Sequence, residues 1–424
     1  MNVVGIITEH NPFHNGHLYH VEKARVQCDA DLVVSVMSGH FLQRGEPALF
    51  NKWARAKMAV LGGVDLVIEL PTAFSVRSAS SFALGAVSIL NSMRVVTHLC
   101  FGTESGNVDS LWPAARLLFN EPALFKALLR QLIDTGISYP AARAGAITRY
   151  LADTASVGIS PEIYAAPNNI LGIEYLKSLL KVKSDIRPTT IKRFAAGYHD
   201  MNIDSNVMIA SATSIREELQ DKGAITEAVG TVVPEASFEV MKQETLAARG
   251  PVFIRDYSKM LFYLLRSLPP EQIAEMYDVS EGLENRIMEI SRSADSVQDL
   301  LSKLKTKRYT RTRLQRILSY ILLGYTKSLA ESFDLAGPRY IRVLGLSSAG
   351  RTLLKRVKKE ADIPVITRTS PFLSQNDDTA LMLKFDVKAT DIYTLMYPGQ
   401  CITRQGLDCK VMPYVGNGQW AIDN

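Results

Sequence analysis

A chain of 424 residues is longer than one hydrophobic core usually supports, so the sequence predicts two domains. Hydrophobic residues make up 47% of the chain and charged residues 21%, which excludes the disordered and fibrous classes of protein. The formal net charge of +5 is compatible with an anionic partner but does not establish one.

The amino-terminal segment predicts a buried strand, a tight turn and a helix. Residues 3–7 form an apolar, β-branched run, and Asn11-Pro12 ends it. Residues 17–25 then place apolar side chains at Leu18, Val21 and Ala24, at the spacing of one face of a helix. His14 and His17 therefore lie where an open α/β sheet binds ligands and where helix N–H groups favour anions. The alternative is an ordinary Asn-Gly turn with two chance histidines.

Strands and helices continue to alternate up to about residue 225. Strands are expected at 31–37, 66–71, 96–101 and 186–193, and helices at 52–61, 80–90, most of 106–153, and 212–219. This alternation predicts an α/β fold with a doubly wound parallel sheet. Beyond residue 230 the pattern is mostly helical, at 253–268, 270–277, 284–291, 296–304 and 312–322, before a mixed tail with strands at 340–345 and 363–367 and a helix at 349–359. We therefore expect a catalytic domain over 1–225 and a mainly helical, basic domain over 226–424.

Polar residues follow four of the predicted strands. They are His14 and His17, Ser38 and His40, Gly102 and Thr103, and Lys192 and Arg193. The carboxyl ends of parallel strands meet at one edge of a sheet, so these residues are expected to form one site, although each alone could be a solvated loop residue. A Walker loop and a Gly-x-Gly-x-x-Gly fingerprint are both absent, so a P-loop or dinucleotide oxidoreductase lacks its signature.

A second candidate anion site stands at the start of the helix expected at 212–219. Thr213, Ser214 and Arg216 offer two hydroxyls and a guanidinium, which suit a phosphate tail. A plain N-cap would need only Thr213 or Ser214, so that interpretation stays open.

Basic residues are dense in the second half of the chain. One stretch holds Lys303, Lys305, Lys307, Arg308, Arg311, Arg313 and Arg316 with no acidic residue, and a second holds Arg351, Lys355, Arg356, Lys358 and Lys359. Such a surface could neutralise several phosphates of a nucleic acid, while the alternative is a solvated helix face. The candidates for contact with RNA are Lys307, Arg308, Arg311 and Arg313.

Compartment and metal content are judged from the cysteines and the apolar runs. Cys28, Cys100, Cys401 and Cys409 show no Cys-x-x-Cys pair and no spacing that matches a histidine, so reduced thiols and no protein metal site are expected. No apolar run is long enough to span a bilayer, and the amino terminus has no export leader. A cytoplasmic protein without a membrane partner is expected.

Two motifs together resemble the HxGH nucleotidyltransferase superfamily. His14-Asn15-Gly16-His17 matches its first motif, and residues 210–216 resemble its Ile-Ser-Ser-Thr-x-x-Arg motif, with Ala212 where a serine is common. The resemblance implies that His14 and His17 contact the nucleotide phosphates and stabilise charge on the α-phosphorus. Adenylyl transfer needs such fixed donors on oxygens that gain negative charge.

A closer resemblance covers nearly the whole chain. Segments 9–20, 39–48, 101–104, 167–172, 191–193 and 308–316 are similar to the tRNA(Met) cytidine acetate ligase family. That resemblance implies a Rossmann-like nucleotidyltransferase fold. It also implies an enzyme that forms acetyl-adenylate from ATP and acetate, then acetylates N4 of the wobble cytidine of elongator tRNA(Met).

The same resemblance implies the residues of the ATP site. They are Ile7, Thr8, Glu9, His10, Asn11, Pro12, Phe13, His14, Asn15, Gly16, His17, Leu18, Tyr19, His20, Gly102, Asn169 and Arg193. His14 and His17 are the implied catalytic residues, and Arg193 and Arg216 neutralise phosphate charge. The family usually has an aromatic residue where this chain has His10. Mg²⁺ is expected with ATP, held mainly by phosphate oxygens.

Two other functions stay open at this point. A small-molecule adenylyltransferase of cofactor biosynthesis would need only residues 1–225, and the long basic appendage is the feature against it. A non-catalytic RNA-binding protein with a relic nucleotide site would need only the second half, and the intact His14 and His17 argue against it.

Overall fold

The computed structural model describes residues 1–155, 162–193, 200–202, 207–399 and 405–416. The strands are β1 (Val3–Thr8), β2 (Leu32–Ser38), β3 (Leu66–Leu70), β4 (His98–Thr103), β5 (Arg187–Lys192), β6 (Asp200–Asn202), β7 (Val207–Ile209), β8 (Ile341–Leu346), β9 (Val365–Ile366) and β10 (Tyr414–Val415). The helices of the first half are α1 (Asn15–Gln27), α2 (Lys52–Leu61), α3 (Thr72–Ser75), α4 (Ala79–Ser92), α5 (Trp112–Asn120), α6 (Ala123–Asp134), α7 (Tyr139–Ala155), α8 (Glu162–Ala165), α9 (Pro167–Lys181) and α10 (Ala212–Lys222). Those of the second half are α11 (Glu227–Val232), α12 (Glu235–Leu246), the 3-10 helix η1 (Ile254–Tyr257), α13 (Ser258–Ser267), α14 (Pro270–Ala274), α15 (Leu283–Ser291), α16 (Val297–Leu304), α17 (Arg311–Leu323), α18 (Lys327–Ala336), α19 (Ser348–Glu360), α20 (Ser370–Leu373), α21 (Asp378–Thr394) and α22 (Leu407–Lys410).

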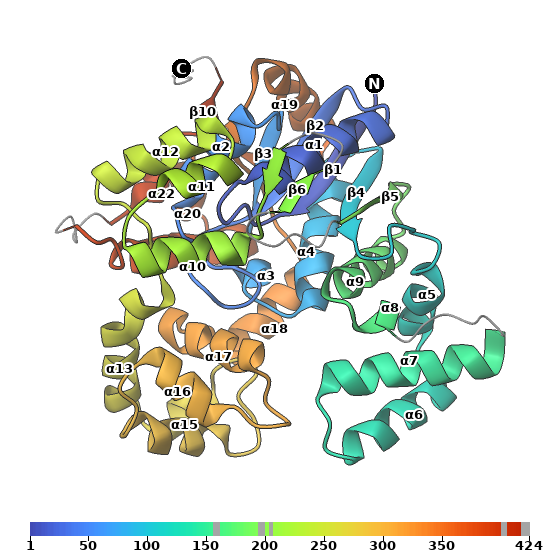
Figure 1. The fold of residues 1–424 in the computed structure, drawn as a ribbon, viewed down its shortest axis with the longest axis vertical. Helices are drawn as coiled ribbons and strands as arrows, with labels where there is room; N and C mark the ends of the chain where they lie inside the picture. The colour runs from blue at the N-terminus through green and yellow to red at the C-terminus, as the bar shows by residue number, and fades with distance from the viewer. Residues whose placement is uncertain (156–161, 194–199, 203–206, 400–404, 417–424) are drawn as a thin grey trace.

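A mixed, mainly parallel sheet forms the centre of the molecule (Figure 1). Its strand order is β10-β8-β3-β2-β1-β4-β5, with β9 beside β8. Neighbouring strands are parallel except for β8, which runs antiparallel to β3. The chain leaves β1 toward β2 and β3 on one side and returns to β4 and β5 on the other. The order therefore switches at β1, and in such sheets ligands bind beyond the carboxyl ends of the strands at that point. The predicted α/β sheet is confirmed.

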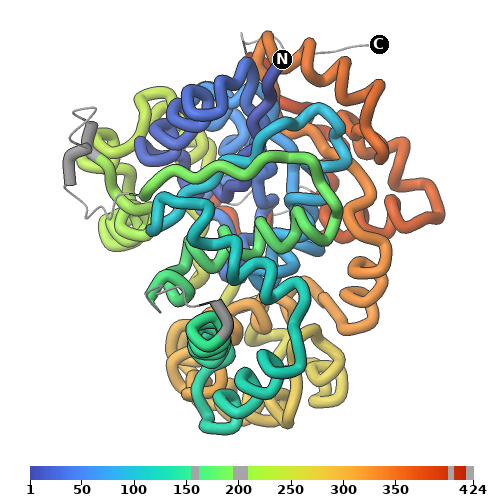
Figure 2. The backbone as a smooth tube through the Cα atoms, turned by 90° about the vertical axis from the view of Figure 1, so that its right-hand side faces the viewer, coloured from blue at the N-terminus to red at the C-terminus, as the bar shows by residue number. Residues whose placement is uncertain are grey.

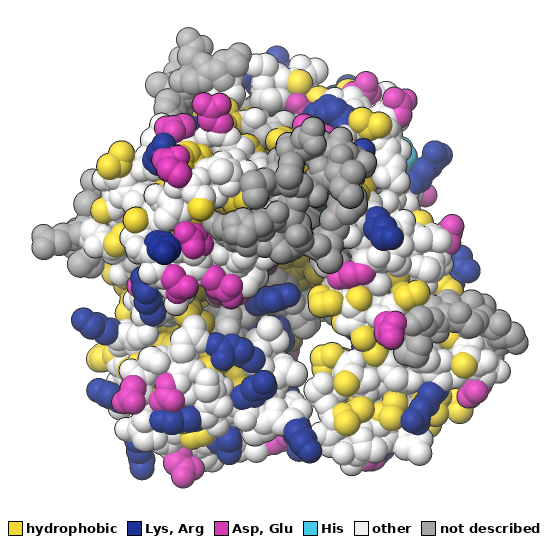
Figure 3. Space-filling model, viewed as in Figure 1, with side chains coloured by type: hydrophobic (Ala, Val, Ile, Leu, Met, Phe, Trp, Pro, Cys, Tyr) yellow, Lys and Arg dark blue, Asp and Glu magenta, His cyan; other side chains and the backbone are white. Residues whose placement is uncertain are grey.

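Two helical lobes lie at one end of this sheet. One holds α13 to α17 and the other α6 and α7, and Figures 1 and 2 place both at the end of the molecule away from the N-terminus. Figure 3 shows Lys and Arg side chains gathered over the α13–α17 lobe. The α19 helix, which carries the second basic stretch, lies at the opposite end in Figure 1. The structure thus separates the two basic stretches that lie close together in the sequence.

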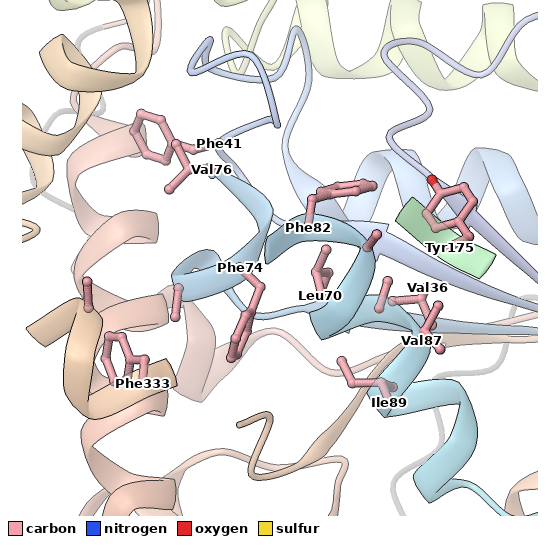
Figure 4. Packing of buried hydrophobic residues seen from close by; sticks show 14 of the residues in the cluster. Val36, Phe41, Leu70, Phe74, Val76, Phe82, Val87, Ile89, Tyr175 and Phe333 are labelled. Carbon is pink, nitrogen blue, oxygen red and sulfur yellow. The ribbon is translucent and has the colours of Figure 1, made fainter. Parts of the chain in front are cut away.

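Helices cover both faces of the sheet, so strand side chains are buried on either side. Successive residues of a strand point to opposite faces. Val3, Val34 and Ile68 pack in a core with residues of α4, α9 and α19, whereas Val4 and Val33 pack with residues of α1, α2 and α12. Figure 4 shows part of the first core, where the aromatic rings of α3 and α4 lie beside apolar side chains of β2 and β3. The near-continuous apolar strands of the sequence are therefore explained by burial on both faces.

The predicted division of the chain at residue 225 requires a correction. Strands β8, β9 and β10, all beyond residue 340, belong to the same sheet as β1. The free edge of β3 would otherwise expose its backbone groups, and β8 pairs with it over Leu66 to Glu69. Residues 226–424 therefore do not form a separate helical unit; only part of them builds the α13–α17 lobe.

A cluster of four buried charges ties these distant segments together. Lys52 Nζ on α2 lies 2.8 Å from Glu69 Oε1 on β3 and 2.6 Å from Asp408 Oδ1 on α22. Arg342 on β8 pairs with the same two carboxylates, at 3.1 Å from Glu69 Oε2. All four side chains are at most 4% exposed, so each charge depends on its partners rather than on water.

Within the described residues, no helix combines the length and apolar character needed to cross a bilayer. Cys28, Cys100 and Cys409 are free thiols, and Cys401 lies outside the described residues.

Candidate active site

His14 and His17 form a reciprocal cap at the start of α1, directly beyond the carboxyl end of β1. His14 Nδ1 accepts the backbone N–H of Gly16 at 3.0 Å, and His17 Nδ1 accepts the backbone N–H of His14 at 3.3 Å. The two ring centroids are 3.9 Å apart. Because each Nδ1 is an acceptor, a neutral ring must carry its proton on Nε2. Both histidines thus present an Nε2–H donor from a fixed backbone turn.

The surroundings keep both rings neutral. Burial, followed by the positive charges of Arg193 and Arg216, lowers the pKa of His14 to about 3. Burial, followed by His14, His10 and Arg193, holds the pKa of His17 well below its ordinary value. The two rings are therefore uncharged donors across the physiological range. The positive charge beside the His14 ring therefore comes from Arg193 and Arg216.

The turn that precedes these histidines is held by Arg55 of α2, by the Asn11 side chain and by Arg216 of α10. Arg55 of α2 is fully buried and donates to the carbonyl oxygens of Phe50 at 2.9 Å, Glu9 at 2.6 Å, Ser38 at 3.1 Å, and Gly39. Asn11 accepts the backbone N–H of Leu49 on its side chain at 2.7 Å, and its carbonyl accepts Arg216 Nη1 at 3.1 Å. The ends of β1 and β2 are therefore fixed relative to each other by one guanidinium.

The sequence predicted the helix over 52–61 but did not identify Arg55 or Lys52 as residues that support the site. Both are buried in α2, together with Ala56 and Ala59. The available signal was their spacing, because Lys52, Arg55 and Ala59 stand at helical intervals on one otherwise apolar face. Two cations on the buried face of a helix indicate a buried polar function.

On the other side of β1, the end of β4 is fixed to the start of α9. Asn169 Oδ1 accepts the backbone N–H of Glu104 at 3.0 Å, and Glu104 Oε2 accepts the backbone N–H of Asn169 at 2.9 Å. Arg193 Nη1 donates to Asn168 Oδ1 at 3.1 Å. A Cβ added to Gly102 would lie 2.8 Å from Arg193 Cγ, so a glycine lets this arginine cross the strand end. The structure thus brings Gly102, Asn169 and Arg193 together; the Asn169 side chain supports the loop backbone.

The first turn of α10 completes the site, with one correction to the prediction. The N-cap is Ser211, whose Oγ accepts the backbone N–H of Ser214 at 3.1 Å, rather than Thr213 or Ser214. Thr213 is exposed and accepts Arg216 Nη2 at 3.4 Å. Ser211 was overlooked because three hydroxyl residues follow each other so closely that the sequence does not single out the capping one. Arg216 is placed beside the turn through its contact with Asn11.

Other residues of the predicted ATP segment have different environments. The Thr8 hydroxyl lies 2.8 Å from that of Ser35, Phe13 is buried in the core, and Leu18 and Tyr19 pack against that core. His10 is 1% exposed, with a left-handed φ of 46°, and its ring stands edge-on to His17 with centroids 4.8 Å apart. Neither His10 ring nitrogen has a hydrogen-bond partner among the described residues. Within this segment Thr8 and Phe13 therefore pack inside the protein, whereas the His10 ring lies against His17.

The predicted RNA contacts lie on the α13–α17 lobe, some of them already paired. Arg313 is 2.9 Å from Asp278 and also donates to its carbonyl oxygen, which fixes the start of α17. Arg308 lies 2.5 Å from Glu281, while Arg311 donates to the neutral Gln298 side chain. Lys307, Arg308 and Arg311 are exposed. Lys307 and Arg311 therefore offer more uncompensated charge than Arg313.

The fold and this turn define a class of enzyme. The protein-family model described as HIGH Nucleotidyl Transferase matches residues 1–408, so the class is that of HIGH-type nucleotidyltransferases. The chain is 43% identical to the tRNA(Met) cytidine acetate ligase of Acetivibrio thermocellus over 96% of this chain and 98% of that protein. It is 40% identical to the protein of the same name from Halothermothrix orenii, over 98% and 100% of the two chains. The chain belongs to the tRNA(Met) cytidine acetate ligase family.

Solved structures agree with this assignment. The crystal structure of Thermotoga maritima TmcAL bound with alpha-thio ATP superposes with a TM-score of 0.89 at 36% sequence identity, covering 98% of this chain and 99% of that one. The apo structure of the same protein gives a TM-score of 0.90 with the same coverage. The comparison therefore extends across both the sheet and the helical lobes.

Proposed function

We propose that this chain is an ATP-dependent acetate ligase that acetylates elongator tRNA(Met). It joins acetate to the α-phosphate of ATP, releasing pyrophosphate, and then transfers the acetyl group to N4 of the wobble cytidine to give N4-acetylcytidine. Support comes from relatives of that name at 40% identity or above and from a similar structure bound to an ATP analogue. The presence of tRNA and ATP together makes the cytoplasm the proposed compartment.

The first half-reaction requires stabilisation of charge rather than covalent catalysis. An acetate oxygen attacks the α-phosphorus, the bond to the pyrophosphate oxygen breaks, and charge on the non-bridging oxygens is redistributed. The Nε2–H groups of His14 and His17 are proposed to donate to these oxygens, while Arg193 and Arg216 neutralise phosphate charge. Neutral histidine donors keep their protons throughout, so they stabilise charge without acting as acids.

The observation that carries this proposal is the reciprocal cap of His14 and His17, because it fixes the tautomer before a ligand binds. The test is pyrophosphate release from ATP, measured with formate, acetate, propionate and butyrate, each with and without elongator tRNA(Met). Acetate is expected to give the highest rate, and tRNA is expected to add a product that carries N4-acetylcytidine. Release that is independent of any carboxylate would contradict a carboxylate ligase.

Mg²⁺ is proposed to enter with ATP, on its phosphate oxygens. Among the described residues, no group of three or more His, Cys, Asp or Glu side chains is placed to hold a metal ion. The described part of the chain thus offers no preformed metal cage, and the chemistry assigned to its residues does not depend on one.

The tRNA backbone is proposed to lie on the α13–α17 lobe, over Lys307, Arg308 and Arg311. Charge reversal in a Lys307→Glu, Arg311→Glu double variant should weaken tRNA binding and flatten its salt dependence by roughly one unit of log–log slope per lost phosphate contact. An Arg351→Glu, Lys355→Glu variant on α19, at the other end of the molecule, is the matched control. Equal losses in the two variants would mean that net charge, rather than this lobe, governs binding.

A further inference from the structure

The Glu9 carboxylate is unusual in a site built for anions. It directly follows β1, is half-buried, and accepts the backbone N–H of Gln43 on Oε1 at 2.7 Å. The phosphates of ATP and the carboxylate of acetate are negatively charged, so this side chain is not suited to bind those groups. A carboxylate at this position suits a group that carries positive charge or loses a proton.

Charged and titratable groups from every neighbouring element act on Glu9. They are Glu46 and Arg44 from the loop after β2, Arg216 from α10, Arg55 from α2 and Tyr175 from α9. Burial outweighs the hydrogen bond from Gln43 and raises the pKa of Glu9 above its ordinary value. A carboxylate with a raised pKa is a stronger base than an exposed one.

The loop that binds the Glu9 carboxylate also contacts the lobe on which tRNA is proposed to bind. This loop, from Phe41 to Pro47, packs on α17: Ser319 Oγ donates to the Gly45 carbonyl oxygen at 2.6 Å. Gly45 has a φ of +79°, and a Cβ there would lie 2.6 Å from the Arg316 backbone, so loop and helix are in direct contact. The order in space is therefore α17, the Gln43 loop, Glu9 and then the histidine turn.

We propose that Glu9 is a catalytic residue of the acetyl-transfer half-reaction. Cytidine N4 attacks the acetyl carbonyl carbon, a C–N bond forms, the C–O bond to AMP breaks, and AMP leaves with that electron pair. The N4 proton lost in this step passes to the Glu9 carboxylate. The inference rests on the proposed function, since it needs a cytidine amine as the acceptor.

The test separates the two half-reactions. Acetyl-adenylate formation is measured as pyrophosphate release without tRNA, and acetyl transfer is measured in single turnover with synthetic acetyl-adenylate and elongator tRNA(Met). Glu9→Gln is expected to slow transfer by about a hundredfold, as loss of a general base does, and by at least tenfold more than it slows adenylate formation. Glu9→Asp keeps a carboxylate and should recover part of the transfer rate.

The pH profile distinguishes a base from a structural residue. In the wild type, the transfer rate should rise with pH up to the raised pKa of Glu9 and then level off. This rise of the rate with pH should persist in Glu9→Asp and in the control Glu46→Gln. Glu46 lies in the same loop as Gln43, with its carboxylate 3.8 Å from Arg216 of α10. The rise should be absent from Glu9→Gln.

Three results would overturn the proposal. Unchanged transfer in Glu9→Gln would remove Glu9 from the step. Equal loss of both half-reactions, with a higher requirement for Mg²⁺, would make Glu9 a magnesium ligand. A wild-type enzyme that forms acetyl-adenylate but does not acetylate tRNA from it would overturn both this role and the proposed function.

Discussion

Replacement of His14 by asparagine tests whether its ring acts as a transition-state donor or only as a helix cap. Asparagine is among the best N-cap residues, so His14→Asn can still accept the Gly16 N–H but presents no group in place of Nε2–H. Loss of one such donor typically costs about 3 to 4 kcal/mol of activation free energy, or a factor of about 10² to 10³ in rate. Pyrophosphate release at saturating ATP and acetate should fall by that factor.

Comparison with His14→Ala isolates the cap. The alanine variant should lose the same catalytic factor and in addition about 1 kcal/mol of unfolding free energy, because Gly16 N–H loses its acceptor. The control is His98→Asn, at the start of β4, whose ring contacts Thr97 rather than the site. A His14→Asn enzyme that keeps a third or more of the wild-type rate would refute the reasoning. A second result would also refute it: a wild-type rate that changes with pH around 6.5, with this pH dependence absent from His14→Asn. A neutral donor gives no such pH dependence.

Three further predictions follow from the geometry. Gly102→Ala should displace Arg193 and weaken ATP binding roughly tenfold, measured by calorimetry, with little loss of stability. Unchanged ATP affinity would mean that Arg193 does not contact the nucleotide. Lys52→Met should lower the unfolding free energy, measured in urea, by about 3 to 5 kcal/mol, because Glu69 and Asp408 keep only Arg342 as a cation. A loss below about 1 kcal/mol would mean that water replaces the lysine. His14 is protonated in the unfolded chain below its ordinary pKa but in the folded chain only near pH 3, so it lowers wild-type stability by about 1.4 kcal/mol for each unit that pH falls through that window. His14→Asn should be less sensitive to acid by that amount between pH 6 and 4, and identical pH slopes of the two unfolding free energies would contradict a neutral buried ring.

The parts of the fold that sequence could predict are those with local signals. The apolar run of β1, the Asn-Pro break and the His-x-Gly-His turn identified the strand end and the first helix, and the structure places them as expected. The residues at 340–345 predicted a strand, but nothing in them indicates that β8 pairs with β3 or runs antiparallel to it. Strand pairing depends on distant partners, which a periodic pattern does not encode.

Supporting residues of the site were harder to predict for the same reason. Arg55 acts through backbone carbonyls, which carry no sequence signature, and the carbonyls of Glu9 and Ser38 converge on it only in the fold. Glu104 and Asn169 exchange hydrogen bonds across 65 positions, and only the family resemblance, not a local pattern, indicated Asn169. The roles proposed for the ATP-site residues themselves remain predictions that the experiments above address.

The cluster of Lys52, Glu69, Arg342 and Asp408 also has a consequence for biosynthesis. The ribosome makes α2 and β3 well before their partners on β8 and α22, which follow much later in the chain. Until then the nascent sheet has an open edge at β3 and ionic side chains that must stay hydrated. The edge of the sheet at β3 can therefore close only after β8 has been made, so fragments that end before β8 are expected to fold poorly.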